Sequence, residues 1–189
     1  MICKYEGEHG VTAVVPASMT LSEEELTSIF TNAANYTQKE NAALFCGINM
    51  EGPFFSPAKK GAQNGTYLQD PSYPLFTRLQ KAANGLIKIV CIAPELPGAL
   101  EFIRKASPYV TISIAHTMAD YDRSEQAFQS GATHVTHLYN AMPAFTHRAP
   151  GVIGAAASYA RSVELISDGV HIHPAVIRAT YQMFGDDRI

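Results

Sequence analysis

The sequence predicts an α/β fold with a parallel β-sheet. Short β-branched and apolar runs alternate with segments of helical periodicity along the chain, at intervals of roughly 25 to 40 residues. Strands that alternate with helices are joined by right-handed crossovers, which place consecutive strands parallel to one another. The 189 residues are 47% hydrophobic, which is enough for a buried core. We therefore expect one domain, residues 1–189.

The first strand and helix are expected within residues 11–33. Residues 11–17 form a β-branched, apolar run that contains Pro16 near its end. A helical pattern follows, with Ser22 as its N-cap and Glu25 as the capping-box partner. The helix carries apolar residues at the spacing that a buried stripe requires, namely Leu26, Ile29, Phe30 and Ala33.

The next two strands are expected at residues 43–50 and 86–93, with a helix over residues 74–83 between them. The first of these strands ends abruptly in Glu51-Gly52-Pro53. A loop of about twenty residues follows, and in compact domains a loop of this length is functional or disordered. The loop is therefore a candidate to carry functional residues.

The second half of the chain continues the alternation. We expect helices at residues 98–105, with Pro97 at the first helical position, at 120–129, with Gly131 just past its end, and at 174–183. Strands are expected at 109–115, 134–138 and 163–167, and a loop containing Pro and Gly follows the second of them.

Two architectures fit this order of elements, a doubly wound open sheet and a (β/α) barrel. Four polar residues come at the carboxyl ends of different strands, namely Glu51, His116, His137 and Asp168, and no Gly-rich phosphate loop follows the first strand. Barrel enzymes build their active sites at that rim from the ends of several strands. The sequence therefore favours a barrel of the TIM type.

Composition and charge indicate which classes of binding partner and which compartment to expect. The net charge is −3 and no run of like charge occurs, so we expect neither nucleic acid nor membrane partners. No apolar run approaches the length of a membrane span and no secretion signal is visible, so the expected compartment is the cytoplasm. Cys3, Cys46 and Cys91 lack a metal or redox spacing, and we expect reduced, buried thiols.

Glu51, His116 and His137 are candidate metal ligands. Side chains alternate along a strand, so His116 is expected to share a face with Ile112, and His137 with Val135. One carboxylate and two imidazoles from three strand ends leave a coordination position open, which is typical of a catalytic metal site. Such a site suits amide hydrolysis. The alternative is that each residue is an ordinary polar residue satisfied by backbone groups.

Other polar residues near these strand ends have weaker signals. The guanidinium of Arg148 suits a carboxylate or phosphate, although a single loop arginine is equally well explained by solvation. Asn140 and Ala141 could present hydrogen-bond donors to a substrate, or simply form a turn. His134 and His173 are expected to be structural.

Several motifs, taken together, carry a family resemblance. They are residues 50–57 (MEGPFFSP), 58–64 (AKKGAQN), 93–95 (APE), 115–117 (AHT), 136–143 (THLYNAMP), 148–151 (RAPG) and 168–171 (DGVH). In this order they resemble the motifs of the N-acetylglucosamine-6-phosphate deacetylases, a family of the amidohydrolase superfamily. The resemblance runs from about residue 10 to residue 173.

The resemblance implies a metal-dependent hydrolase of amino-sugar catabolism. Its members remove the acetyl group from N-acetylglucosamine 6-phosphate and release glucosamine 6-phosphate and acetate. By motif match, Glu51, His116 and His137 would hold a divalent metal, either zinc or iron.

The same match implies residues that bind the substrate. Asn140, Ala141 and His171 would contact the sugar phosphate. Arg148 would bind the phosphate from the neighbouring subunit of a homodimer. Asp168 would support the motif that contains His171.

The match also implies which parts of the family fold lie elsewhere. The His-X-His motif of the first barrel strand is expected before Met1, and the general acid/base aspartate beyond Ile189, so the expected catalytic acid/base residue is not among these 189 residues. We therefore expect an incomplete barrel, about strands two to seven of eight, without the family's β-sandwich domain.

Two alternatives differ from an active deacetylase. One is a catalytically inactive fragment that binds a metal or a sugar phosphate. The other, a dihydroorotase-like amidohydrolase, is disfavoured because those enzymes use a carboxylated lysine where this chain has Glu51.

Overall fold

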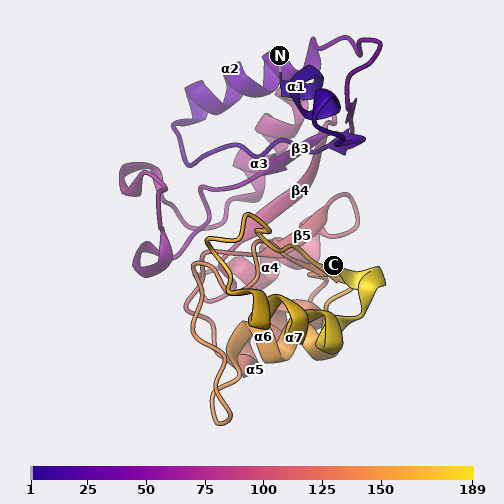
Figure 1. Cartoon of the computed structure of the whole chain (residues 1–189). Helices are drawn as coiled ribbons and strands as arrows, with labels where there is room; N and C mark the ends of the chain where they lie inside the picture. Colours follow the sequence, from indigo (N-terminus) through magenta and orange to yellow (C-terminus); the bar gives the residue numbers. More distant parts are fainter. Residues whose placement is uncertain (1) are drawn as a thin grey trace.

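The computed structural model describes residues 2–189 (Figure 1). A five-stranded parallel sheet has its strands in sequence order, and a two-stranded parallel sheet precedes it. The large sheet consists of β3 (Ile48–Met50), β4 (Ile87–Ile92), β5 (Thr111–Ile114), β6 (His134–Val135) and β7 (Ser162–Val163), and the small sheet of β1 (Ala13–Val14) and β2 (Leu44–Phe45).

Helices lie between the strands along the chain, and the parallel α/β fold predicted from the sequence is confirmed. They are α1 (Ile2–Glu8), α2 (Glu23–Ala34), α3 (Tyr73–Ala82), α4 (Ala99–Ala106), α5 (Tyr121–Gln129), α6 (Gly151–Tyr159) and α7 (Pro174–Phe184), with short 3₁₀ turns η1 (Pro57–Lys59), η2 (Gly65–Tyr67) and η3 (Asp186–Arg188). Among the strands of residues 2–189 the order contains no reversal, so these residues do not form the doubly wound alternative. Within residues 2–189 the sheet is open, with β3 and β7 at its edges.

The strand expected at residues 43–50 is divided into β2 and β3. Gly47 lies between them with φ of +138°, and a Cβ at this position would lie 2.7 Å from the carbonyl oxygen of Leu86. Because only glycine adopts this conformation in so little space, the run bends here and its two halves join different sheets. Cys46, beside the bend, is exposed, so its expected burial is wrong, whereas Cys3 and Cys91 are buried free thiols.

Helix α2 begins as predicted. The amide of Glu25 donates to Oγ of Ser22 at 3.2 Å, and Oε2 of Glu25 accepts from the amide of Ser22 at 3.0 Å, which completes the capping box. Leu26 and Phe30 are fully buried, but the side chain of Ile29 is 43% exposed. The predicted apolar stripe is therefore narrower than its spacing indicates.

One prediction about a later helix is wrong, and one helix was not predicted. Helix α4 begins at Ala99 with Gly98 as its N-cap, so Pro97 lies before the helix rather than at its first position. Helix α6 occupies residues that were assigned no regular structure. It consists mainly of small and apolar residues and buries Val152, Ile153 and Ala156 without a polar face that would mark a helical period.

The two faces of the large sheet differ in chemistry. The helix-facing side is apolar and includes Ile48, Met50, Val90, Ile92, Ile112, Ile114, Val135 and Val163, which form one cluster with residues from the helices. The opposite side is polar. The thiol of Cys91 contacts Asn49 Oδ1 at 3.2 Å and Thr136 Oγ1 at 3.3 Å, and Ser113 Oγ lies 2.7 Å from the same Thr136 hydroxyl. The sheet therefore packs on helices with one face and carries buried polar groups on the other.

None of the helices formed by residues 2–189 is long and apolar enough to span a membrane.

Candidate metal centre

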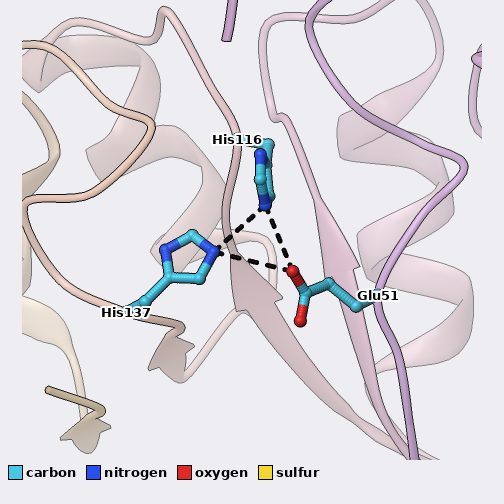
Figure 2. A group of neighbouring side chains, drawn as sticks. All are labelled: Glu51, His116 and His137. Carbon is cyan, nitrogen blue, oxygen red and sulfur yellow. Dashed lines mark hydrogen bonds and ion pairs between the residues drawn. The ribbon is translucent and has the colours of Figure 1, made fainter. Parts of the chain in front are cut away.

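Glu51, His116 and His137 converge at the carboxyl ends of β3, β5 and β6 (Figure 2). Nε2 of His116 lies 3.2 Å from Oε1 of Glu51 and 3.1 Å from Nε2 of His137. Nε2 of His137 lies 3.7 Å from the same carboxylate oxygen. All three ligand atoms fit within 4.8 Å of one another, and the sequence therefore identified the three members of this cluster.

The expectation that strand alternation places His116 on the face of Ile112, and His137 on the face of Val135, is wrong. Ile112 and Val135 point into the helix-facing core. His116 lies away from that core and stacks on Phe55, with the two ring centroids 4.3 Å apart. The strands end at Ile114 and Val135, and the backbone then turns left-handed, with φ of +47° at His116 and +35° at His137. Strand alternation therefore does not extend to these residues, and the turn brings both imidazoles to the site.

A backbone carbonyl fixes the tautomer of His116. Nδ1 of His116 lies 2.9 Å from the carbonyl oxygen of Lys59. A carbonyl only accepts hydrogen bonds, so Nδ1 carries a proton, and Nε2 is the ring atom left to coordinate a cation. Two imidazole nitrogens and a carboxylate oxygen therefore point at one volume, an arrangement that fits a divalent cation. Nδ1 of His137 is buried and has no partner among the described residues.

The electrostatics of the cluster favour an ionised carboxylate. Burial raises the pKa of Glu51, but hydrogen bonds from His116 and His137 and their charges outweigh it and bring the pKa to about 2. Burial lowers the pKa of His137, but the hydrogen bond and charge of Glu51 outweigh it, so that pKa is raised. Glu51 is therefore negative at neutral pH and available to a cation.

Gln63 is a contact of the centre that sequence reasoning missed. Its side-chain amide donates to Oε1 of Glu51 at 3.3 Å, and its carbonyl accepts from the backbone amide of Thr20 at 2.6 Å. Gln63 is buried although it lies in the long loop after β3. That loop has no periodicity, and the sequence indicated a functional role only by the length of the loop and by residues 58–64 as part of the family resemblance.

Lys59, in the same loop, joins two parts of the site. Its carbonyl orients His116, and its ammonium donates to the carbonyl oxygen of Met142 at 3.1 Å. Met142 follows Asn140 and Ala141 in the loop after β6. The loops that follow β3 and β6 are therefore tied together beside the centre.

Asn140 and Ala141, predicted to contact a substrate, lie in the turn directly after His137. The amide of Asn140 donates to the carbonyl of His137 at 2.9 Å, and its side chain donates to the carbonyl of Leu138 at 3.3 Å. Ala141 has φ of +53°, and its carbonyl accepts from the amide of Thr117 at 3.0 Å. Both residues therefore adjoin the centre.

Arg148 and His171 are not drawn into the cluster. Both are exposed, and within residues 2–189 no hydrogen bond or ion pair joins either of them to Glu51, His116 or His137. His171 donates from Nδ1 to Oδ2 of Asp168 at 2.6 Å, and the same carboxylate accepts from the backbone amides of Val170 and His171. Asp168 thus orients the His171 turn.

The two histidines expected to be structural have structural contacts. His134 lies between Ser162 Oγ at 2.8 Å and Glu164 Oε1 at 2.9 Å. Nδ1 of His173 accepts from the amide of Ala175 at 3.2 Å and caps α7. Neither ring adjoins the metal centre.

No protein-family model matches the chain. A curated N-acetylglucosamine-6-phosphate deacetylase of Bacillus subtilis (strain 168) is 38% identical over 188 residues, covering 96% of this chain and 48% of that protein. The protein of that name from Danio rerio is 34% identical over 191 residues, covering 96% of this chain and 47% of its own length. The chain thus spans about half the length of the curated relatives it matches.

A solved structure agrees with these relatives. It is a mutant of the N-acetyl-D-glucosamine-6-phosphate deacetylase of Mycobacterium smegmatis in complex with N-acetyl-D-glucosamine-6-phosphate. It superposes with a TM-score of 0.91 at 34% identity and covers 98% of this chain and 49% of that one. The resemblance predicted from the motifs is confirmed.

Proposed function

We propose that this chain, which is homologous over 96% of its length to N-acetylglucosamine-6-phosphate deacetylases, forms the metal-binding part of an enzyme with that activity. The reaction is hydrolysis of the acetamide of N-acetylglucosamine 6-phosphate to glucosamine 6-phosphate and acetate. The observation that carries the proposal is the convergence of Glu51, His116 and His137 at one edge of the parallel sheet.

In this proposal Glu51, His116 and His137 hold one divalent cation, zinc or iron, because imidazole and carboxylate ligands suit both. A bound cation supplies a Lewis acid that polarises the amide carbonyl and lowers the pKa of a bound water molecule. The chain's own contribution is orientation. The Lys59 carbonyl holds the His116 ring, and the amide of Gln63 holds the Glu51 carboxylate.

The sugar phosphate is assigned to residues around the centre. Asn140 and Ala141 adjoin His137 and can present donors to the substrate. His171 is oriented by Asp168. The exposed guanidinium of Arg148 is available to a phosphate, and we propose that it serves the neighbouring subunit of a homodimer.

The open sheet fits an arc of a (β/α) barrel, because its strands follow one another in sequence order. In the whole barrel a general acid/base would be needed as well. Glu51 is the only carboxylate of the ligand cluster among the described residues, and it is held there by two imidazoles. We therefore propose that the acid/base comes from outside these 189 residues.

The presence of only one carboxylate, Glu51, in the cluster of the described residues favours a second candidate function. In this function the chain binds the metal or the sugar phosphate without turnover. Acetate release separates the two functions. The chain alone and a version extended to the length of its relatives are incubated with N-acetylglucosamine 6-phosphate and zinc or iron. Release by the extended protein supports the deacetylase. If neither protein releases acetate while both bind metal, the binding function replaces it.

A further inference from the structure

The backbone at His116 needs support. Its φ of +47° lies in the left-handed region, which L-residues with a side chain adopt only when the surroundings hold them there. His116 is also buried, so its ring cannot shift without disturbing Phe55 and the Lys59 contact. The position of one metal ligand thus depends on what holds this turn.

Two backbone hydrogen bonds hold the turn from either side. The carbonyl of His116 accepts from the amide of Ser56 at 3.0 Å, and the amide of Thr117 donates to the carbonyl of Ala141 at 3.0 Å. Ser56 belongs to the loop that follows Glu51, and Ala141 to the loop that follows His137. The turn is therefore connected to the loops of both other ligands.

A carboxylate provides the third support. Glu95 lies in the loop between β4 and α4 and accepts from the hydroxyl of Thr117 at 2.5 Å and from the amide of Met118 at 2.6 Å, one donor to each oxygen. Hydrogen bonds to an ionised acceptor are short and strong. The Thr117 hydroxyl accepts in turn from the amide of Ala119 at 2.8 Å.

Thr117, which donates to the Glu95 carboxylate, lies directly after His116 and is held rigidly by its surroundings. Thr117 is fully buried, and Arg123 donates from Nε to the carbonyl of Pro94 at 2.7 Å, which ties the start of the Glu95 loop to α5. The loop after β4 is therefore joined at two places to the segment that follows His116, once at Thr117 and Met118 and once at α5.

We infer that Glu95 is a positioning residue of the metal centre, acting through Thr117 and Met118 on the turn that aims His116 at the cation. The inference rests on the proposed metal binding and adds a residue from the loop after β4, a strand whose end contributes none of the three cluster residues. Its carboxylate stabilises the left-handed turn before a cation arrives. Without it, the His116 imidazole samples positions that do not meet Glu51 and His137.

Cobalt(II) tests this assignment, because its absorption bands report ligand geometry as well as binding. The variants are Thr117→Val, which removes the hydroxyl at nearly constant volume, and Glu95→Ala. Thr117→Ser keeps the hydroxyl, and Glu101→Ala removes an exposed carboxylate of α4 that pairs with Lys105. Thermal melts without metal establish which variants are folded.

Thr117→Val and Glu95→Ala are expected to weaken Co²⁺ binding by about 10- to 100-fold and to alter the absorption bands, as loss of an outer contact of a metal ligand does. Thr117→Ser and Glu101→Ala are expected to match the wild type in affinity and spectrum. A purely structural Glu95 would lower the melting temperature and leave the affinity and bands of the folded protein unchanged.

The assignment is overturned if the Thr117→Val variant folds and has the Co²⁺ affinity and absorption bands of the wild type. If the Glu95→Ala variant does not fold, the Thr117→Val variant alone decides the question. The assignment also fails if Thr117→Ser loses as much affinity as Thr117→Val. A wild-type chain that binds no Co²⁺ contradicts the proposed metal centre itself, and the inference fails with it.

Discussion

Gln63 donates a hydrogen bond of 3.3 Å from its side-chain amide to Oε1 of Glu51, the oxygen that also faces His116 and His137. Its side-chain carbonyl meanwhile accepts from the buried backbone amide of Thr20. One side chain therefore links the carboxylate ligand to the segment that precedes α2. This hydrogen bond favours the orientation in which the carboxylate faces the two imidazoles.

Replacing Gln63 with alanine should affect both metal binding and stability. The affinity for Zn²⁺ is expected to fall about 10-fold, because Glu51 loses the donor that orients it. The free energy of unfolding should fall by about 1–3 kcal/mol, because the Thr20 amide loses its partner. Competition with a chromogenic chelator and urea unfolding measure the two effects. Asn64→Ala, in which only an exposed turn contact is lost, should preserve the affinity.

Removing a ligand should abolish stoichiometric metal binding. Glu51→Gln, His116→Asn and His137→Asn each change one of the three converging ligands, leaving two, one fewer than a catalytic metal site has. Elemental analysis of the purified proteins measures the metal content. His147→Asn changes an exposed histidine outside the cluster and should retain it. Unchanged metal content in all three ligand variants would show that the ion binds elsewhere.

Arg148 should discriminate the phosphorylated from the unphosphorylated sugar. In a protein extended to the length of its relatives, Arg148→Ala is expected to raise KM for N-acetylglucosamine 6-phosphate roughly 10- to 100-fold, which is the effect of one lost hydrogen-bonded charge. KM for N-acetylglucosamine should change little. His147→Ala, at the adjacent exposed position, is the control. Equal changes for both sugars would exclude a phosphate contact.

Asp168 should titrate well below an ordinary aspartate. Backbone hydrogen bonds from His171 and then Val170, followed by the His171 side chain, lower its pKa from 3.8 to about 2. Because the folded pKa is the lower one, its stabilising contribution is complete above the unfolded pKa and is lost as the pH falls from about 4 to about 2. Carboxyl NMR should give this titration directly.

The His171→Ala variant separates the causes of that shift. The backbone amides remain, and they are the larger contribution, so the pKa of Asp168 should rise but stay below 3.8. A complete return to 3.8 would mean that the imidazole, rather than the turn, controls the carboxylate. The variant Arg161→Ala, which removes an exposed cation that makes no hydrogen bond or ion pair with Asp168 or His171 within residues 2–189, should leave the titration unchanged.

Much of the fold and the members of the Glu51, His116 and His137 cluster could be predicted from the sequence because their signals are local. The Ser22–Glu25 capping box, the parallel α/β order and the polar residues at strand ends depend on neighbours a few positions apart. Helix α6 escaped prediction because its small, apolar residues lack a polar face. The division at Gly47 escaped because the constraint comes from Leu86, far along the chain.

The sequence by itself determined that Glu51, His116 and His137 follow three parallel strands, and the carboxyl ends of such strands meet at one edge of a sheet. Only the tertiary structure decided that these side chains face one another. Alternation along β5 directs His116 toward the helices, and the left-handed turn reverses that direction. The turn is held by Ser56, Ala141 and Glu95, hydrogen-bond partners from three other loops that no local pattern reveals.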